Sequence, residues 1–402
     1  MWVMGPSIAA QRPRCYRFAP LRPGYGRPAQ RAMPVPFIDL TRLSSEIAAA
    51  VEQDWHQCLQ RCEFVGGPRV ARLETELAQI LGAPHALTCA NGTDALIIAL
   101  QALGVGRGHK VALPNLTFWA TYEAIAQVGA TPVLLDIDPT DGQLDVDQLR
   151  KAHADIGLDA VLAVHLYGWA SHRLTELRQF CRDHGLPLLE DGAQAFGVLL
   201  DGQPLLGPAT AGTVSFYPAK VVGGAMDGGA MTFAHPEALE LARSLCNHGR
   251  ADHYSYAHVG WNSRMGGLQA AYLLRTLEKL PQILASRRRA TDWYRQRFAG
   301  HPTIRVMAPP AGITENGYLN VTHVQGKTGV QLSDALKAAG IGCARTYPEP
   351  LHTQPPAAPA IVFGAMAHSR QICASVINLP VFYAMTDAEL QASADALEQA
   401  AA

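Results

Sequence analysis

Lys220 lies at a point where the side chains along the sequence become small. It closes the run Ser215-Phe216-Tyr217-Pro218-Ala219-Lys220, and the glycine-rich segment 223–229 follows it. Glycine allows other groups to approach the backbone closely. A lysine in a partly dry site loses proton affinity, so its amine can attack an aldehyde and form an imine (Schiff base). Most lysines in such loops are simply solvated, so Lys220 alone does not establish an imine-forming site. Other residues with matching chemistry are needed to support that interpretation.

Several residues elsewhere in the chain complement an imine-forming lysine. Pyridoxal 5′-phosphate (PLP) needs that lysine, an anion beside its ring nitrogen, a cup for its phosphate and a flat surface for its ring. Asp191 can supply the anion, which keeps the ring nitrogen protonated and makes the ring an electron sink. Phe118 can stack on the ring, with Trp119 as the second choice, and Gln194 can bond the ring hydroxyl. The phosphate candidates are Gly92, Thr93 and Ser215.

Two of the phosphate candidates, Gly92 and Thr93, open a predicted helix. The turn Asn91-Gly92-Thr93 follows an apolar segment, and apolar residues at helical spacing run from Ala95 to Leu103. The free N–H groups at a helix start, together with the helix dipole, can bind an anion. The same turn is also typical of a simple N-cap, so the cofactor interpretation depends on Lys220 and Asp191 being close by.

The elements that lead to Asp191 form a βαβ pattern. Asp159–Tyr167 is predicted as an apolar strand, Leu174–His184 as a helix, and Leu186–Leu189 as a second buried strand that ends in Glu190 and Asp191. Helical and strand signals alternate along most of the chain, which predicts an α/β fold with a mainly parallel central sheet covered by helices. In such sheets ligands bind beyond the carboxyl ends of the strands, where Asp191 is expected.

The character of the sequence changes toward both ends. Residues 1–33 contain six arginines, five prolines and no acidic residue, so we predict a disordered, dispensable extension, with Met33 as an alternative start of translation. Residues 34–285 form the predicted large domain. An arginine-rich helix around 287–289 and a connection rich in proline and glycine follow, which predicts a smaller α+β C-terminal domain over residues 286–402.

The overall composition excludes several classes of protein. The 402 residues carry a formal net charge of −1, so no basic field exists for nucleic acid, and no apolar run approaches the roughly 20 residues that cross a bilayer. Eight scattered cysteines lack the spacing of a disulfide framework or a zinc site. His56, Cys58 and Cys62 offer too few metal ligands, and we interpret Cys58 and Cys62 as buried on one helix face. We predict a soluble, cytoplasmic protein without a metal.

Ordered matches over residues 34–395 resemble the DegT/DnrJ/StrS-type sugar aminotransferases, a branch of the fold type I PLP enzymes. The sequence departs from the family at Val221-Val222 and Met226, where Asn-Leu and glycine are common, and at His368, where an acidic residue is common. One branch of the family carries histidine in place of the lysine and performs deoxygenation, and Lys220 argues against that branch. The matching segments are Val35–Leu40, Asn91–Leu96, Glu190–Ala195, Ser215–Lys220, Asp227–Gly229, Asn247–Gly249, Asn262–Arg264, Gln269–Ala271 and Tyr347–His352.

The resemblance implies a role for each matching site residue. Lys220 would be the imine lysine and the base that moves the proton on the donor carbon. The other implied cofactor contacts are Asp191 to the pyridine nitrogen, Gln194 to the ring hydroxyl, and Thr93 and Ser215 to the phosphate. Asn262 would reach the phosphate from a partner subunit, which implies a homodimer with shared active sites.

The resemblance also implies the substrates. L-Glutamate or glutamine would give its amino group to a keto-sugar, most simply a 3-keto or 4-keto hexose linked to dTDP, UDP or GDP, in amino-sugar biosynthesis. The opening Asn91-Gly92-Thr93-Asp94 resembles members that act on 3-keto sugars. His352, Tyr347 and Arg345 are predicted substrate contacts, because arginine suits a phosphate, although a structural role is equally open for each.

The sequence is also compatible with two alternative functions. The chain could be a PLP transaminase that acts on a keto-cyclitol instead of a nucleotide sugar. It could also be a catalytically silent regulatory or binding protein, because a fold alone never guarantees activity. The intact set of Lys220, Asp191, Thr93 and Ser215 argues against the silent protein.

Overall fold

A mainly parallel sheet forms the centre of the part of the chain that the structure describes. The computed structural model describes residues 35–402, and the predicted extension 1–33 lies outside the described residues. Within residues 35–402 eight strands pair in the order β1-β9-β8-β5-β4-β2-β3-β13. These strands are β1 (His85–Cys89), β2 (Lys110–Pro114), β3 (Thr131–Leu135), β4 (Ala160–Val164), β5 (Leu188–Asp191), β8 (Ala211–Ser215), β9 (Gly229–Phe233) and β13 (Ile361–Phe363).

The pairing confirms the predicted α/β fold. Every pair from β8 to β13 is parallel, and only β9 runs antiparallel to its neighbours β1 and β8. The predicted βαβ unit is also confirmed as β4, α6 and β5, although β5 begins at Leu188 and extends through Asp191. Asp191 pairs with Val164 on one side and Thr213 on the other, so it lies at the carboxyl edge of the sheet.

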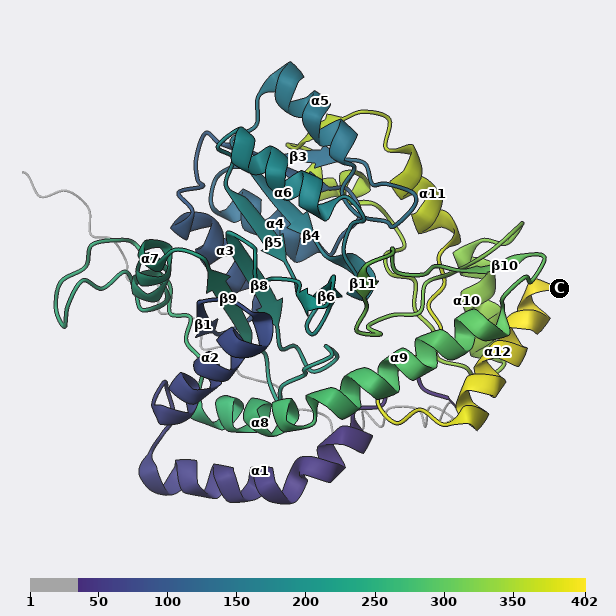
Figure 1. Ribbon diagram of the computed structural model, residues 1–402, viewed down its shortest axis with the longest axis horizontal. Helices are drawn as coiled ribbons and strands as arrows, with labels where there is room; N and C mark the ends of the chain where they lie inside the picture. The colour runs from purple at the N-terminus through teal and green to yellow at the C-terminus, as the bar shows by residue number, and fades with distance from the viewer. Residues whose placement is uncertain (1–34) are drawn as a thin grey trace, which may run out of the picture. The chain divides into compact units, whose positions relative to one another are not determined.

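Helices cover both faces of the sheet (Figure 1). Apolar residues of α3, α4 and α7 pack on one face, and those of α2, α8, α5 and α6 pack on the other. Helix α1 lies beside α8. The helices of residues 35–402 are α1 (Thr41–Arg61), α2 (Pro68–Leu81), α3 (Gly92–Ala102), α4 (Trp119–Gln127), α5 (Val146–Ile156), α6 (Leu174–Asp183), α7 (Pro236–Cys246), α8 (Gly267–Glu278), α9 (Leu280–Arg297), α10 (Gly329–Ala338), α11 (Ala367–Ser375) and α12 (Asp387–Ala401).

The C-terminal third contributes both to its own core and to the central sheet. A separate buried cluster joins α9, α10 and α12 with the short strands β10 (Ile304–Val306) and β12 (Thr322–Val324). Strand β13 nevertheless returns to the edge of the large sheet beside β3. Strand β11 (Ile313–Thr314) pairs with β6 (Leu199–Leu200), which also pairs with β7 (Gln203–Pro204). The predicted domain boundary at 285/286 falls inside α9 and stays a prediction.

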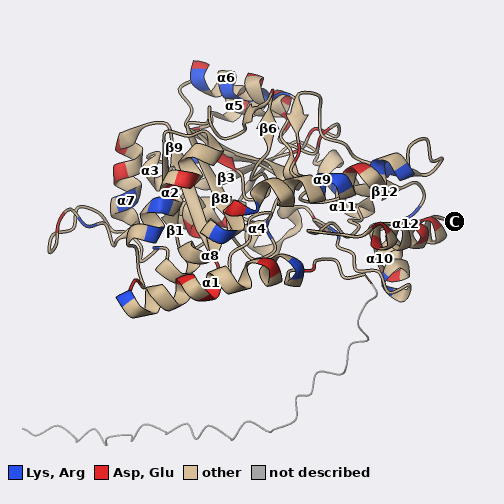
Figure 2. Ribbon diagram, turned by 60° about the horizontal axis from the view of Figure 1, so that its bottom comes forward, with Lys and Arg blue, Asp and Glu red and all other residues tan. Residues whose placement is uncertain are grey.

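One expectation about the cysteines is wrong. Cys58 is buried within α1 as predicted, but Cys62 is exposed at the end of that helix, where its φ of 54° breaks the helical path. The two side chains therefore do not share a helix face. No helix among residues 35–402 is long and apolar enough to cross a membrane. Charges of both signs are distributed over the outer helices (Figure 2).

Candidate active site

A cavity of about 630 Å³ lies at the carboxyl edge of the parallel strands. The start of α3, the loop before α4, the end of β5 and the loop after β8 contribute to its wall, together with residues from the C-terminal third. Most of the residues predicted from the sequence line this one cavity. They are Gly92, Thr93, Phe118, Asp191, Gln194, Ser215, Lys220 and Tyr347.

Lys220 is held by a tight turn after β8. Its backbone N–H donates to the carbonyl of Tyr217 at 2.8 Å. The glycines that follow are needed by the chain itself, because a Cβ at Gly223 would lie 2.1 Å from the Pro218 carbonyl oxygen and one at Gly224 would lie 2.0 Å from the Gln269 amide nitrogen. The groups that approach the backbone of Gly223 and Gly224 are therefore parts of the protein itself, namely Pro218 and Gln269.

Gln269 of α8 fixes the far side of the same loop. Its side-chain oxygen accepts the N–H groups of Ala225 and Met226 at 3.1 and 3.2 Å, and its side-chain nitrogen donates to the Met226 carbonyl at 2.8 Å. The side chain of Gln269 is almost fully buried. One buried amide thus satisfies several backbone groups that no strand or helix would satisfy, and it makes the Lys220 loop rigid.

Asp191 is a buried carboxylate whose hydrogen-bond donors are both neutral. One oxygen accepts the N–H of Ala193 at 3.0 Å, and the other accepts the hydroxyl of Thr121 at 3.1 Å. Burial raises the pKa of Asp191, although the Ala193 N–H, the charge of Lys220 and the Thr121 hydroxyl act in the opposite direction. A cation at this position would relieve the cost of the buried negative charge.

Glu190 anchors the same strand from behind the cavity. Arg178 of α6 holds its carboxylate with two bonds of 2.7 Å, and His165 contacts it at 2.8 Å. Burial by itself would raise the pKa of Glu190, but the His165 hydrogen bond and the charge of Arg178 lower it to about 2. The network fixes the end of β5 and therefore the direction of Asp191.

The start of α3 forms the anion-binding end of the cavity. The Asn91 side chain caps the helix by accepting the N–H of Asp94 at 2.8 Å, so the earlier N–H groups of Gly92 and Thr93 remain for a ligand. Gly92 packs directly against Ser215, since a Cβ there would lie 2.8 Å from the Ser215 Cβ. The N-cap and the anion-site interpretations are thus compatible. Asn91 caps the helix, and the N–H groups of its neighbours Gly92 and Thr93 can bind an anion.

Phe118 and Gln194 bound the middle of the cavity. Phe118 is 56% exposed, and its ring lies 6.1 Å from that of Tyr347. Trp119, the second choice for stacking, packs its ring on Tyr122 at 4.6 Å instead. Gln194 accepts the backbone N–H of Tyr167 at 2.8 Å and donates to the Tyr347 hydroxyl at 3.0 Å. A flat ligand between Phe118 and the sheet edge would meet both of these side chains.

Three predicted contacts lie outside this cavity lining. Arg345 donates to the Cys373 carbonyl at 3.1 Å, and His352 contacts the Asn115 side chain. Asn262 is exposed and accepts a bond of 2.5 Å from Arg264. Because Asn262 was predicted to act on a partner subunit, its position in one chain does not test that role, and the roles of all three stay predictions.

Two polar residues of the site were missed by sequence reasoning. Thr121 binds Asp191, and Tyr318 accepts a bond of 3.3 Å from the Lys220 amine. Thr121 lies on the first turn of α4, directly after Phe118. Its closeness in sequence to Phe118 could therefore have indicated that it lies near the site. Tyr318 follows Lys220 by 98 residues and carries no local motif, so only the folded chain reveals it.

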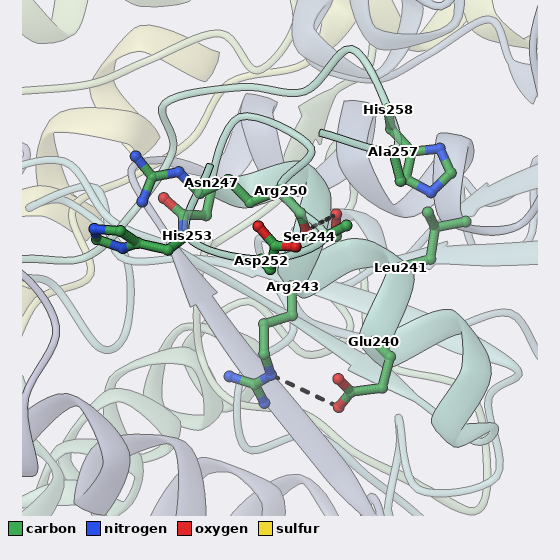
Figure 3. Close-up of a pocket in the computed structure, with 11 residues that line it drawn as sticks. Glu240, Leu241, Arg243, Ser244, Asn247, Arg250, Asp252, His253, Ala257 and His258 are labelled. Atoms are coloured by element: carbon green, nitrogen blue, oxygen red, sulfur yellow. Dashed lines mark hydrogen bonds and ion pairs between the residues drawn. The ribbon is translucent and has the colours of Figure 1, made fainter. Parts of the chain in front are cut away.

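A second, more open hollow of about 720 Å³ lies between α7 and the hairpin 247–260 (Figure 3). Charged side chains of both signs line it, including Arg243, which is paired with Glu240, and Asp252. None of the predicted cofactor-binding residues belongs to its lining within the described part of the chain. We therefore assign the chemistry to the Lys220 cavity.

The residues of the Lys220 cavity fit PLP. The buried Asp191 has only neutral donors and can accept a cationic ring nitrogen, while the open N–H groups of Gly92 and Thr93 suit a phosphate. Lys220 and Phe118 line the same cavity as these two groups. The arrangement therefore provides each of the four features that PLP requires.

Comparisons with known proteins agree with this site. The sequence matches the DegT/DnrJ/EryC1/StrS aminotransferase family over residues 45–398. It is 36% identical over 325 residues to UDP-2-acetamido-2-deoxy-3-oxo-D-glucuronate aminotransferase of Pseudomonas aeruginosa, which covers 80% of this chain and 88% of that protein. It is 33% identical over 354 residues to UDP-N-acetyl-3-dehydro-alpha-D-glucosamine 3-aminotransferase of Acidithiobacillus ferrooxidans, which covers 87% of this chain and 93% of that protein.

A solved structure shares the whole architecture. The crystal structure of S. venezuelae DesV in complex with a ketimine intermediate matches with a TM-score of 0.86 at 31% identity, and it covers 91% of this chain and 98% of that chain. The fold and the site together define a PLP-dependent aminotransferase of fold type I. The chain belongs to the DegT/DnrJ/EryC1/StrS aminotransferase family and is a PLP-dependent sugar aminotransferase. The predicted family, fold class and cofactor are confirmed.

Proposed function

We propose that the enzyme transfers the amino group of L-glutamate to the ketone of a nucleotide-linked 3-keto hexose, with UDP as the first nucleotide to test. The single observation that carries the chemistry is the convergence of Lys220, Asp191 and the α3 start on one cavity. The acceptor is supported by the two relatives from P. aeruginosa and A. ferrooxidans, whose names describe aminotransferases of UDP-linked 3-keto sugars.

Each protein group has a defined task in this proposal. PLP, when bound, supplies an electron sink that carries the amino group from donor to acceptor. Lys220 holds the cofactor at rest, and its amine, once displaced, moves the proton on the donor carbon. Asp191 holds a proton on the ring nitrogen, because its carboxylate lies in a buried site without another cation bonded to it. The α3 start, Thr93 and Ser215 hold the phosphate.

Two copies of the chain would share each site in this proposal. Asn262 pairs with Asn247 at the base of the hairpin 247–260. The hairpin exposes Tyr254 near its tip to 85% and Val259 near its base to 95%. Large apolar side chains with such exposure are typical of a surface that meets a partner. We propose that this hairpin reaches the second subunit and brings Asn262 to that subunit's phosphate. A cytoplasmic location belongs to the same proposal, because the cysteines of residues 35–402 are free.

A substrate panel tests the acceptor. Purified enzyme would be incubated with L-glutamate and UDP-, dTDP- or GDP-linked hexoses that carry a ketone at carbon 3 or carbon 4, and the amino-sugar product would be measured by mass spectrometry. The proposal predicts the highest kcat/KM with a 3-keto acceptor. A keto-cyclitol without a diphosphate is the matched control. Preference for the cyclitol, or for a 4-keto acceptor, would contradict the proposed substrate but leave the transaminase chemistry intact.

A further inference from the structure

Residues 315–318, which follow β11 and which we call the strap, are held against α9 by arginines. Arg288 donates to the backbone carbonyl of Glu315, and Arg295 binds the Glu315 carboxylate at 2.6 and 2.9 Å. Arg287 donates to the backbone carbonyl of Tyr318 at 3.0 Å. The arginines of α9 therefore bind the strap, and the last residue of the strap, Tyr318, lines the active-site cavity.

The strap is also fixed from its other side. The Asn316 side chain donates to the carbonyls of Gln194 and Phe196 at 2.8 and 2.9 Å, and it accepts the N–H of Tyr318 at 2.9 Å. Gly317 has a φ of 69°, and a Cβ there would lie 2.6 Å from the backbone of Arg287. The strap therefore has little freedom to shift, and Tyr318 inherits its fixed position.

Arg287 is an unusual member of this clamp. It is almost fully buried, and both of its bonds, to the carbonyls of Gly317 and Tyr318, go to neutral groups at 3.0 Å. Burial lowers its pKa to about 10. A buried cation without a carboxylate partner costs free energy, and a merely structural position would accommodate an apolar side chain more easily. The cost is understandable if the position of Tyr318 matters for function.

Tyr318 meets the reactive lysine directly. The Lys220 amine donates to the Tyr318 hydroxyl at 3.3 Å and lies 5.1 Å from the centre of the Tyr318 ring. The hydroxyl and the electron-rich ring face both attract an ammonium group. The carboxylate of Asp191 is close enough to feel the charge of this amine, but its hydrogen bonds go to Ala193 and Thr121. Tyr318 is therefore the direct hydrogen-bond partner of the Lys220 amine.

We propose that Tyr318 holds the Lys220 amine in its reactive position whenever that amine is free, and that Arg287 is the positioning residue that holds Tyr318. The inference rests on the proposed role of Lys220 and adds to it a second catalytic residue. Without Tyr318 the flexible lysine stem would sample several rotamers, and the amine would reach the reacting carbon less often.

Covalent capture of PLP by the cofactor-free full chain measures this positioning without turnover. Stopped-flow absorbance would give the rate constant for capture, and fluorescence titration would give the affinity for pyridoxine 5′-phosphate, which has no aldehyde. We expect Tyr318→Phe to capture PLP about tenfold more slowly, the equivalent of one lost hydrogen bond. Its affinity for pyridoxine 5′-phosphate should equal that of the unaltered chain. Tyr294→Phe is the matched control, because it removes a buried hydroxyl of the C-terminal core cluster that bonds to the Pro380 carbonyl and does not line the cavity.

The role of Arg287 is tested by its coupling to Tyr318. Arg287→Lys keeps the charge but cannot hold two carbonyls in the same way, so capture should slow to a similar extent. In the double variant with Tyr318→Phe the two effects should not add, because both act on the same hydroxyl. Arg289→Lys changes an exposed neighbour that pairs with Asp387, so capture by this control should keep its rate.

The outcomes separate the inference from the proposed function. Capture by Tyr318→Phe at the unaltered rate would overturn the inference, and so would an equal loss of capture and of pyridoxine 5′-phosphate affinity, which would indicate a structural role only. Additive effects in the double variant would overturn the role of Arg287. Lys220→Ala should show no capture at all. If it captured PLP normally, the proposed function of Lys220 would fail, whatever the Tyr318 variants do.

Discussion

Asp191 pays an energetic penalty in the cofactor-free fold that the bound cofactor would remove. Its pKa is raised by burial from the usual 3.8, so the folded chain keeps a proton that the unfolded chain loses as the pH rises above 3.8. The free energy of unfolding therefore falls as the pH rises through that window. Such a penalty is typical of a side chain that is held for function instead of for stability.

The variant Asp191→Asn separates these two effects. It should lower turnover by about 10²–10³-fold, the size of a lost preorganised charge, because the ring nitrogen loses its anion. In the PLP-free protein its melting temperature at pH 7 should be higher than that of the unaltered chain, since the buried charge is gone. Calorimetry of the PLP-free proteins checks this, and a clearly lower melting temperature would contradict our account of Asp191.

The pKa of Glu190, the residue directly before Asp191, shifts in the opposite direction. Its pKa is lowered from 4.5 to about 2, so its stabilising contribution is fully present above pH 4.5 and is lost as the pH falls toward 2. Glu190→Gln should cost about 3–5 kcal/mol in the free energy of unfolding at pH 7, because it leaves Arg178 buried without its partner. Urea unfolding measures this cost.

The control for Glu190 lies on α6, the helix that carries its partner Arg178. Glu176→Gln breaks the pair of Glu176 with Arg173, which is more exposed, and should cost no more than about 1 kcal/mol. If the two variants lost equal free energies of unfolding, the buried Glu190 network would stabilise the fold no more than the exposed pair does.

At the scale of elements, the start of α3 and the end of β8 meet so closely that only glycine fits between them. Alanine normally stabilises a helix by about 1 kcal/mol relative to glycine. At Gly92 the new Cβ would lie 2.8 Å from the Ser215 Cβ, so steric overlap should outweigh that gain. Gly92→Ala should weaken PLP binding at least about tenfold, because the phosphate end of the cavity shifts.

Equilibrium titration with PLP measures the effect of Gly92→Ala. Gly106→Ala is the matched control, since its Cβ would lie 3.6 Å from the nearest atom, the Val128 carbonyl oxygen, which is an ordinary contact. The control should bind PLP as the unaltered chain does. Normal PLP affinity in Gly92→Ala would exclude the α3 start as the phosphate anchor.

The elements were predictable from the sequence wherever the signal was local. Apolar periodicity predicted α3, β4, α6 and β5 to within a few residues, and the position of Asp191 followed from the general behaviour of parallel sheets. The clamp on Tyr318 was not predictable, because it joins residues of α9, the strap and the Lys220 loop that are far apart in sequence. Spacing also could not show that Arg345 turns to a backbone carbonyl.

At the scale of the whole molecule, the central question is whether one chain holds a complete site. If Asn262 acts on the partner's cofactor, Lys220→Ala and Asn262→Ala should complement each other when mixed. Random pairing makes half of the dimers mixed, and each of these has one intact site, so about a quarter of the original activity should return. Subunit exchange followed by an activity assay tests this. Failure to recover activity, or full activity in monomers, would contradict shared sites.

The most direct test of the account is the visible absorption spectrum of the purified enzyme before and after addition of L-glutamate, with Lys220→Ala as the comparison. We predict a band from lysine-bound PLP that fades when glutamate is added, because the amino group moves onto the cofactor. Lys220→Ala should lack both the band and the response. The absence of a band after PLP is supplied, or the same response in Lys220→Ala, would contradict the assignment of Lys220.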